Sequence, residues 1–388
     1  MEVRTLLVAG GSGGHLIPAM TLAESLRGEG PCWLMSTARP VDREIASAFD
    51  KLRPRNDGGL EWVTVDLRPW KPLRRWLSPF FLAHQLGALR RVWTLLRRIQ
   101  PDLVIGFGGY LSAVGLTLAR LQRVPTVIHE QNLMPGRANR WLAPLADAVA
   151  VSFPETTWFL SRRAVVEFTG NPVRPRLKGV SSSEGRSHFR FDPDRPVLLV
   201  MGGSQGSQAV NQVVLKMWEK VGAEDRQRLQ VIHLTGAQQF DQVVETYRRL
   251  SMEARVFPFL HQMEFALAAA TLALSRAGAT AIAEMMALGL PAILIPYPHA
   301  GGHQRFNAHW VDFAGGAAVL EERELTPEKL WAEVSALLWD SKRLAQMKEA
   351  LGRRADGSAA ERLRILVYRI AGHTPGRVEE PQPAPVRG

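Results

Sequence analysis

The sequence carries the same strand, glycine and helix pattern twice, half a chain apart. The first copy reads Leu6-Leu7-Val8-Ala9-Gly10-Gly11-Ser12-Gly13-Gly14, and the second reads Leu198-Leu199-Val200-Met201-Gly202-Gly203-Ser204-Gln205-Gly206. In both copies a short apolar run leads into a glycine turn and then into a helical pattern, which is how a Rossmann-like parallel-sheet domain begins. Two such starts predict two domains, and a chain of 388 residues is long enough to bury a core in each.

Strand-like and helix-like segments alternate through both halves of the chain, which predicts the α/β class. In the first half we expect strands at residues 3–9, 32–36, 62–66, 103–107, 126–129 and 148–152. In the second half we expect them at residues 197–201, 230–234, 254–257, 272–275, 292–295 and 317–320. The two predicted domains face each other across a cleft, and this cleft is the expected active site.

Composition suggests the domain boundaries. Residues 171–195 are rich in Pro, Ser, Arg and Gly and form the expected linker. It separates an N-terminal domain over residues 1–170 from a C-terminal domain over residues 196–357. We expect the helical segment 358–371 to complete the N-terminal domain and the tail, residues 373–388, to be disordered.

Cysteine usage and hydropathy indicate a cytosolic chain. The single cysteine, Cys32, cannot form an intramolecular disulfide, and the first residues run into a strand-like segment without a signal-peptide pattern. No apolar run reaches the roughly 18 to 20 residues that a membrane-spanning helix needs.

The formal net charge of +11 predicts an acidic partner such as nucleic acid, anionic lipid or a phosphorylated substrate. Between Asp66 and Asp102 the sequence has many basic residues and no acidic one. Residues 70–81 of this window interleave aromatic with basic side chains, as segments at a membrane surface do. We therefore expect contact with an anionic membrane through residues 70–81, and no binding of nucleic acid.

A helix is expected in the second half of this basic window. Leu82, Leu86, Leu89, Trp93 and Leu96 recur at helical spacing, which predicts an apolar stripe facing a core and arginines facing outward. An ordinary solvated basic face is the alternative interpretation of those arginines.

The first glycine turn, Gly10-Gly11-Ser12-Gly13-Gly14-His15, is a candidate anion site, because glycines let the backbone approach a phosphate at a helix N-terminus. A dinucleotide site would need a third glycine where Leu16 stands and an acidic residue near Ser36-Thr37-Ala38. NAD is therefore not expected. His15 has a side chain whose ordinary pKa of about 6.5 suits a general base, and a helix-capping histidine is the alternative.

A second turn, Arg276-Ala277-Gly278-Ala279-Thr280-Ala281-Ile282-Ala283-Glu284, also follows a buried strand and opens a helix. Its amides and Thr280 suit a pyrophosphate. Glu284 would repel phosphate and suits sugar hydroxyls, with a ribose diol as the obvious partner. The alternative is a solvated helix glutamate.

Further polar clusters follow other predicted strands. His129-Glu130-Gln131-Asn132 lies where a parallel sheet presents its ligand-binding edge, and Gly106-Phe107-Gly108-Gly109-Tyr110 lies at the same edge. No cluster has metal-ligand spacing, and Asp192-Pro193-Asp194 is interpreted as a turn. We expect neither a metal nor a cofactor, so helix dipoles and amides would neutralise a leaving phosphate.

Taken in order, these motifs resemble those of the MurG family of glycosyltransferases. The resemblance also includes Gly170-Asn171-Pro172-Val173-Arg174 and His303-Gln304-Arg305-Phe306-Asn307-Ala308 and covers nearly all the chain before the tail. It implies a GT-B fold and an inverting transfer of N-acetylglucosamine from UDP-N-acetylglucosamine to undecaprenyl-pyrophosphoryl-muramyl-pentapeptide. It also implies a peripheral enzyme on the cytoplasmic face of the bacterial inner membrane, with other cell-wall synthesis proteins as partners.

The resemblance also assigns expected site residues. His15 would be the base that activates the muramyl hydroxyl, with Glu130 as the second candidate. The expected donor contacts are Ser12, Gly13, Gly14, Asn132, Arg174, Ser204, Leu260, Ala279, Thr280, Ala281, Ile282, Ala283, Glu284 and Gln304.

Three positions depart from the family pattern. Ser112-Ala113-Val114 stands where the family often has Ser-Gly-Pro, Gly302 stands where an acidic residue is common, and Leu260 stands where isoleucine is frequent. Other open interpretations are a related enzyme acting on another glycolipid, a UDP-N-acetylglucosamine epimerase, and a non-enzymatic protein that binds anionic lipid or RNA.

Overall fold

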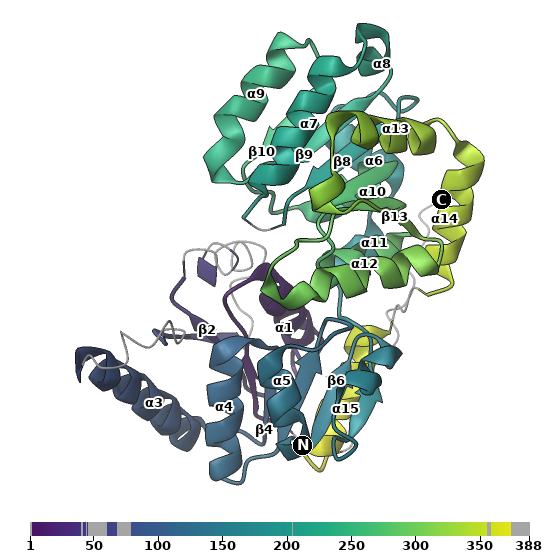
Figure 1. Ribbon diagram of the computed structural model, residues 1–388. Helices are drawn as coiled ribbons and strands as arrows, with labels where there is room; N and C mark the ends of the chain where they lie inside the picture. The colour runs from purple at the N-terminus through teal and green to yellow at the C-terminus, as the bar shows by residue number, and fades with distance from the viewer. Residues whose placement is uncertain are drawn as a thin grey trace, which may run out of the picture.

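The structure is a computed structural model that describes residues 2–39, 42–43, 45, 60–67, 79–203, 205–354 and 358–373. Figure 1 shows two α/β domains, one above the other, with the N-terminal half of the chain below and most of the C-terminal half above. The helix α15 (Ala359–Ile370), drawn in yellow, lies with the lower, N-terminal domain. The predicted class of two Rossmann-like domains in a GT-B arrangement is confirmed.

The N-terminal domain contains a parallel seven-stranded sheet in the order β3-β2-β1-β4-β5-β6-β7. Its strands are β1 (Thr5–Val8), β2 (Cys32–Thr37), β3 (Leu60–Val65), β4 (Leu103–Gly106), β5 (Thr126–Glu130), β6 (Ala148–Val151) and β7 (Val166–Phe168). The six strands predicted in this half correspond to β1 to β6. The sequence analysis missed β7, because three residues are too short a run to show strand periodicity.

Helices cover both faces of this sheet. They are α1 (Gly13–Ser25), α3 (Pro79–Ile99), α4 (Gly109–Leu121), α5 (Arg137–Leu142) and α15, with 3-10 turns at η2 (Ala143–Leu145) and η3 (Pro154–Phe159). Leu7 packs with α1 and α15 on one face, whereas Leu6 and Val8 pack with α3 and α4 on the other. Successive strand residues point to opposite faces, and both faces are covered, so Leu6, Leu7 and Val8 of β1 are all apolar.

The buried stripe of α3 differs from the predicted one. Leu82 and Leu86 are 50% and 64% exposed, and the buried positions are instead Ala88, Val92 and Leu95, together with Leu96 as predicted. Gln85 is buried as well, so the buried positions fall one residue before the predicted Leu86, Leu89 and Trp93, and the face that packs on the core is rotated from the predicted one. The arginines of α3 face outward, as expected. Residues 70–78, and with them most of the predicted membrane segment, lie outside the described residues.

The C-terminal domain contains a parallel six-stranded sheet in the order β10-β9-β8-β11-β12-β13. Its strands are β8 (Val197–Met201), β9 (Gln230–Leu234), β10 (Ala254–Phe257), β11 (Leu272–Ser275), β12 (Ala292–Leu294) and β13 (Ala317–Val319). All six correspond to predicted strands.

Helices also surround this second sheet. They are α6 (Ser182–His188), α7 (Gln208–Lys220), α8 (Ala223–Gln227), α9 (Phe240–Arg249), α10 (Met263–Ala269), α11 (Ala279–Leu288), α12 (His303–Phe313), α13 (Pro327–Leu338) and α14 (Ser341–Gly352). Four 3-10 turns join them, at η4 (Pro175–Gly179), η5 (Ala237–Gln239), η6 (Ala300–Gly302) and η7 (Glu322–Glu324). Helices α10, α11 and α12 pack on one face of the sheet, and α7 and α13 pack on the other.

The segment predicted to link the domains is partly folded. Helix α6 starts with a capping box at Ser181 and Glu184. A Cβ at Gly185 would lie 2.6 Å from the amide nitrogen of Ala269, so glycine allows α6 to cross α10 closely. Phe189 and Phe191 join the core of the C-terminal domain.

Both sheets place their ligand-binding edges toward the space between the domains. In the first sheet β1 lies between β2 and β4, and in the second β8 lies between β9 and β11. The strand order reverses at these positions, and open α/β sheets bind ligands in the crevice at such a switch point. The loop after β1 contains the glycine turn that ends at His15, and the loop after β11 contains the turn that leads to Glu284.

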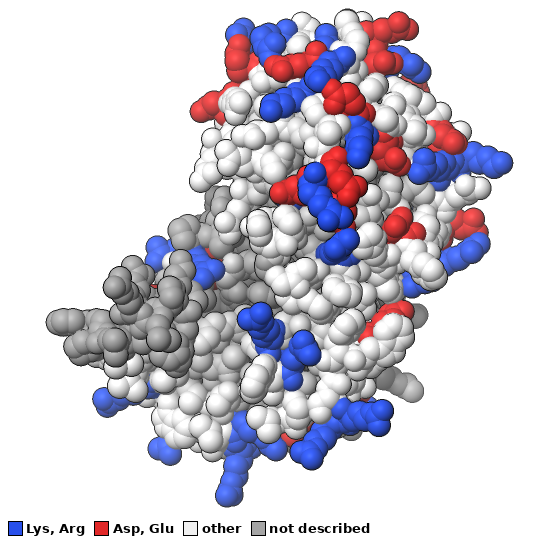
Figure 2. Space-filling model, in the orientation of Figure 1, with Lys and Arg blue, Asp and Glu red and all other residues white. Residues whose placement is uncertain are grey.

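Within the described part of the chain, no helix combines the length and apolarity needed to span a bilayer. On the face drawn in Figure 2, acidic side chains are sparse over the N-terminal domain, whereas both signs are mixed over the C-terminal domain.

Candidate active site

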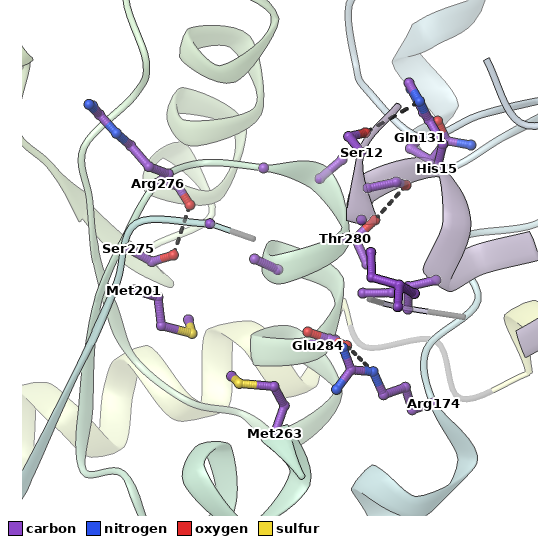
Figure 3. Close-up of a pocket in the computed structure, with 18 of the residues that line it drawn as sticks. Ser12, His15, Gln131, Arg174, Met201, Met263, Ser275, Arg276, Thr280 and Glu284 are labelled. Carbon is purple, nitrogen blue, oxygen red and sulfur yellow. Dashed lines mark hydrogen bonds and ion pairs between the residues drawn. The ribbon is translucent and has the colours of Figure 1, made fainter. Parts of the chain in front are cut away.

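A cavity of about 750 Å³ lies between the two domains. The N-terminal domain contributes the loop after β1 and the residues after β5, and the C-terminal domain contributes the loops after β8, β11 and β12. Figure 3 shows Ser12 and His15 on one side of this cavity and Met263 and Glu284 on the other. The two candidate residues from different domains, His15 and Glu284, thus share one space.

Most of the predicted site residues line this cavity. Those that do so are Ser12, Gly13, Gly14, His15, Asn132, Arg174, Leu260, Ala279, Thr280, Ala281, Glu284 and Gln304. Glu130, Ile282 and Ala283 are not part of its lining, and Ser204 lies outside the described residues.

The first turn of α11 explains why Ile282 is excluded. Gly278 is the N-cap of this helix, so the amides of Ala279, Thr280 and Ala281 have no acceptor within the helix. The amide of Ile282 already donates to the carbonyl of Gly278 at 3.0 Å, and its side chain is buried in the core. An anion at this helix end would therefore meet the amides of residues 279–281.

His15 has the hydrogen bonding of a general base. Its Nδ1 lies 3.2 Å from the carbonyl oxygen of Gly10 and 3.3 Å from Oγ of Ser12. A carbonyl oxygen only accepts a hydrogen bond, so this contact assigns the proton to Nδ1 and leaves a lone pair on Nε2. Burial lowers the pKa of His15, although the Gly10 carbonyl and the charges of Glu130 and Asp42 oppose this effect. The imidazole is therefore neutral at pH 7.

Gly108 leaves room for this imidazole. Its backbone has φ 98° and ψ 175°, a conformation essentially restricted to glycine. A Cβ at this position would lie 3.1 Å from Nε2 of His15. The glycine in the loop after β4 therefore keeps the basic nitrogen unobstructed.

Glu130 is a poor second candidate for the base, because its carboxylate is fully engaged. It is 1% exposed, and it accepts hydrogen bonds from the backbone amides of Asn132 and Gly136, both at 2.9 Å. It also accepts from the side-chain amides of Asn132 at 3.1 Å and Asn139 at 2.7 Å. The residue organises the loop after β5, next to His15.

Glu284 is a buried carboxylate with one charged partner. It is 5% exposed, and its Oε1 lies 3.3 Å from Nε of Arg174 but has no hydrogen-bond partner. Burial raises the pKa of Glu284, Arg174 lowers it, and the charge of Glu264 raises it further. Figure 3 shows the side chains of Arg174 and Glu284 pointing toward each other.

Hydrogen bonds join the two domains around the cavity. Oγ1 of Thr280 donates to the carbonyl of Gly14 at 3.0 Å, so this hydroxyl is already occupied. Asn307 on α12 is fully buried; its Oδ1 accepts from the amide of Leu133 at 2.9 Å and its Nδ2 donates to Oδ1 of Asn132 at 3.1 Å. Asn132, a predicted donor contact, is thus also a domain contact.

Arg276 holds loops of the C-terminal domain together. Its guanidinium donates to Oγ of Ser207 at 2.8 Å and forms an ion pair with Glu322. Figure 3 shows the side chain extending away from Thr280 and Glu284. It therefore fixes the loop that precedes α7 without pointing at the centre of the cavity.

Both domains of the chain match models of known protein families. Residues 5–151 match the glycosyltransferase family 28 N-terminal domain, and residues 197–363 match the glycosyltransferase family 28 C-terminal domain. The chain belongs to glycosyltransferase family 28.

Individual family 28 relatives resemble the chain over nearly its whole length. It is 39% identical to the UDP-N-acetylglucosamine-N-acetylmuramyl-(pentapeptide) pyrophosphoryl-undecaprenol N-acetylglucosamine transferase of Nitrosococcus oceani, over 94% of this chain and 97% of the relative. It is 36% identical to the protein of the same name from Halothermothrix orenii, over 90% and 94%. The crystal structure of Acinetobacter baumannii MurG superposes with a TM-score of 0.68 at 26% identity, over 94% and 99%. The resemblance to the MurG family is confirmed.

The sequence analysis overlooked Asp42, which supports the first glycine turn of this family 28 chain. Asp42 is fully buried, and its two oxygens lie 3.0 and 3.1 Å from the amide of Gly11. It also accepts a hydrogen bond from Thr37. The amide of Gly11 is therefore not available to an anion. An acidic residue soon after the second strand is the signal that would have indicated it.

Glu264 is a second residue that the sequence analysis overlooked. It lines the cavity although it is 4% exposed, and it is the second residue of α10. Glu264 could have been recognised in the sequence, because it is the lone carboxylate in the apolar run Met263-Glu264-Phe265-Ala266-Leu267.

The described residues contain no cluster of three or more His, Cys, Asp or Glu suited to hold a metal ion. The pair Asp192 and Asp194 forms the predicted turn, in which the amide of Asp194 donates to Oδ1 of Asp192 at 2.9 Å.

Proposed function

We propose that this chain transfers N-acetylglucosamine from UDP-N-acetylglucosamine to the muramyl hydroxyl of undecaprenyl-pyrophosphoryl-N-acetylmuramyl-pentapeptide, with inversion at the anomeric carbon. Two relatives at 36% and 39% identity are named for a transfer of this kind. The main support for the proposal is that His15 of one domain and Glu284 of the other line the same cavity. This arrangement suits an acceptor and a donor that meet between the domains.

His15 is the proposed base. Its Nε2 accepts the proton of the muramyl hydroxyl while the hydroxyl oxygen bonds to the anomeric carbon and the bond to UDP breaks. The hydrogen bond from Nδ1 to the Gly10 carbonyl orients the imidazole ring and stabilises the imidazolium that forms. Glu130 supports this change, because its negative charge favours protonated His15.

The C-terminal domain is the proposed donor site. The amides of residues 279–281 bind the diphosphate and stabilise the charge that develops on departing UDP. Glu284 accepts a hydrogen bond from the ribose, and Arg174 holds the carboxylate in place. Gln304 lies beside this site, and its Oε1 accepts from the amides of Ala277 at 3.1 Å and Tyr297 at 3.0 Å. Ser204 stays a predicted contact.

The N-terminal domain is the proposed membrane-facing part, at the cytoplasmic face of the bacterial plasma membrane. Leu82 and Leu86 on α3 are exposed and follow residues 70–81, and Arg90 and Arg91 are exposed on the same helix. Exposed apolar side chains beside cations suit a surface of anionic lipid. A lipid-linked acceptor would reach the cavity from this side.

One assay tests the transfer. Donor labelled in its N-acetylglucosamine is mixed with the protein and the lipid-linked monosaccharide in vesicles, and the label is followed into the lipid fraction. Label that stays in the aqueous phase would contradict the proposal. Consumption of the donor without acceptor would instead favour an epimerase.

A further inference from the structure

Gln131 is a buried side chain whose amide nitrogen is fully used within the protein. It is 2% exposed and comes directly after β5. Its Nε2 lies 2.9 Å from Nδ1 of His129 and donates to the backbone carbonyl of His129 at 3.0 Å. A carbonyl oxygen only accepts a hydrogen bond, so the second contact assigns the nitrogen of the amide, and not its oxygen, to the side that faces His129.

The protonation of His129 shows that the first contact is also a hydrogen bond from Gln131. His129 is fully buried, and its Nε2 lies 3.1 Å from the carbonyl oxygen of Gly170. This contact assigns the proton to Nε2 and leaves a lone pair on Nδ1. Burial lowers the pKa of His129 to about 4, although the Gly170 carbonyl opposes this effect, so the ring is neutral at pH 7. Both hydrogens of the Gln131 amide therefore bind His129.

The oxygen of the same amide is left without a protein partner. Gln131 lines the cavity, and among the described residues its Oε1 makes no hydrogen bond. This oxygen is not enclosed by the protein, unlike the unpaired Oδ1 of Asn171 and Oε1 of Glu284. It therefore opens on the cavity. An acceptor removed from bulk water is costly unless it is paired, so this position suits a ligand that carries an O–H or N–H donor.

Gln131 belongs to the half of the site that contains the proposed base. Figure 3 shows Gln131 on the same side of the cavity as Ser12 and His15. The loops that carry Gln131 and His15 follow β5 and β1, and in the sheet only β4 lies between these two strands. The free amide oxygen is thus placed on the acceptor side of the cavity.

The chemistry of the proposed acceptor indicates which donor meets this oxygen. In the N-acetylmuramyl ring C1 carries the pyrophosphate, C2 carries the acetamido group and C3 carries the lactyl ether, so free hydroxyls remain at C4 and C6. One of the two reacts, and the other does not. Because C4 and C6 are both bonded to C5, these hydroxyls lie at the same end of the sugar, whereas the acetamido N–H lies across the ring. A base that takes the proton of one hydroxyl therefore has the other close by.

We propose that Oε1 of Gln131 accepts a hydrogen bond from the free muramyl hydroxyl that does not react, and that it thereby directs the other hydroxyl toward Nε2 of His15. This inference rests on the proposed function, because the muramyl acceptor supplies both hydroxyls. A sugar held at the neighbouring hydroxyl presents the reacting oxygen in one orientation, which is how a positioned contact favours a reaction. Gln131 is thus a residue that determines which hydroxyl of the acceptor reacts.

The test uses a soluble acceptor analogue, with a short chain in place of the undecaprenyl group, and its two monodeoxy versions, each of which lacks one of the free hydroxyls. Binding is measured by titration calorimetry without donor. Gln131→Met keeps the length of the side chain but removes the amide oxygen. It is expected to bind the intact analogue about tenfold more weakly than the wild type does, as loss of one hydrogen bond predicts.

One monodeoxy version should bind Gln131→Met as well as it binds the wild type, because it already lacks the hydroxyl that meets Gln131. This version should also be the one to which the wild type still transfers labelled sugar, since it keeps the reacting hydroxyl. The affinity for UDP-N-acetylglucosamine should not change. Gln227→Met is the matched control, because Gln227 is exposed on α8, and it should alter none of these affinities.

Thermal melting confirms that Gln131→Met folds, and the comparison of analogues on the wild type needs no variant. The inference is overturned if Gln131→Met weakens the binding of all three analogues equally, or of none. It is also overturned if the version that is insensitive to Gln131→Met is the one that accepts no sugar. A wild type that discriminates between the analogues as expected, but transfers sugar to none of them, would instead contradict the proposed function and leave the contact of Gln131 with a free hydroxyl standing.

Discussion

Thr280 donates a hydrogen bond from its hydroxyl to the carbonyl of Gly14 at 3.0 Å, joining the first turn of α11 to the first turn of α1. The two helices belong to different domains, and their positive ends meet at the cavity (Figure 3). The sequence predicts that the Thr280 hydroxyl binds a pyrophosphate. In the structure this hydroxyl is instead part of the contact between the two domains. This leaves the amides of residues 279–281 as the groups that bind the diphosphate.

His15→Ala is expected to lower kcat by about 10², because a positioned general base typically contributes this much. The Michaelis constant for the donor should change little, since the imidazole is proposed to contact the acceptor. Steady-state transfer of labelled N-acetylglucosamine measures both. His309→Ala, which removes an exposed histidine of α12, is the control, and an unaltered rate in His15→Ala would place the base elsewhere.

Asp42→Asn is expected to move the acid limb of the pH profile of kcat/KM to lower pH. His15 acts as a base only when neutral, so activity falls as the pH drops through its pKa. The Asp42 charge raises this pKa against the lowering effect of burial, and its removal lowers the pKa further. A purely structural role would reduce the rate at every pH and leave the midpoint of this limb in place.

Gly108→Ala is expected to destabilise the protein by about 1–3 kcal/mol, because its backbone conformation is strained for any residue with a Cβ. The new Cβ would also press on Nε2 of His15, so kcat should fall further than stability alone explains. Gly87→Ala in α3 is the control; a Cβ there has open space, and the helix should gain up to about 1 kcal/mol. Urea unfolding and kinetics compare the two, and a fully active Gly108→Ala would contradict this account of the loop.

Glu284→Gln is expected to raise the Michaelis constant for the donor about tenfold while stabilising the free protein at pH 8. Burial raises the folded-state pKa of Glu284, so the stability it contributes is present below the unfolded pKa and is lost as the pH rises through the folded pKa. The gain in melting temperature from glutamine should therefore shrink as the pH falls toward 5. A gain that is independent of pH would mean that the charge of Glu284 is not the cause.

The double variant Leu82→Ser and Leu86→Ser is expected to weaken binding to anionic vesicles, because it removes exposed apolar surface from α3. Turnover of a soluble acceptor analogue should persist. Val244→Ser removes a comparable exposed side chain from α9 in the other domain and should leave vesicle binding intact. Co-sedimentation with vesicles measures the effect, and equal loss in both proteins would exclude α3 as the membrane surface.

Prediction from sequence succeeded where the signal is local. The glycine turns before α1 and α11 were recognisable because a short apolar run, glycines and a helical pattern follow one another within about fifteen residues. The same reasoning failed for α3, where Leu82 and Leu86 fit a helical stripe, but the buried face, which includes Gln85 and Ala88, is rotated from that stripe by one residue. Periodicity predicts which residues share a helix face, whereas the face that becomes buried depends on the partner against which the helix packs.

The sequence by itself determined two Rossmann-like domains and placed His15 and Glu284 at the ends of strands that open helices, because turn chemistry and periodicity act between neighbouring residues. The tertiary structure decided which polar groups remain available. Asp42 accepts a hydrogen bond from the amide of Gly11, 31 residues away in the sequence. Thr280 donates a hydrogen bond to the carbonyl of Gly14, from which it is separated by 266 residues. Such pairings depend on how distant segments pack, and the same packing placed the buried Glu264 in the lining of the cavity.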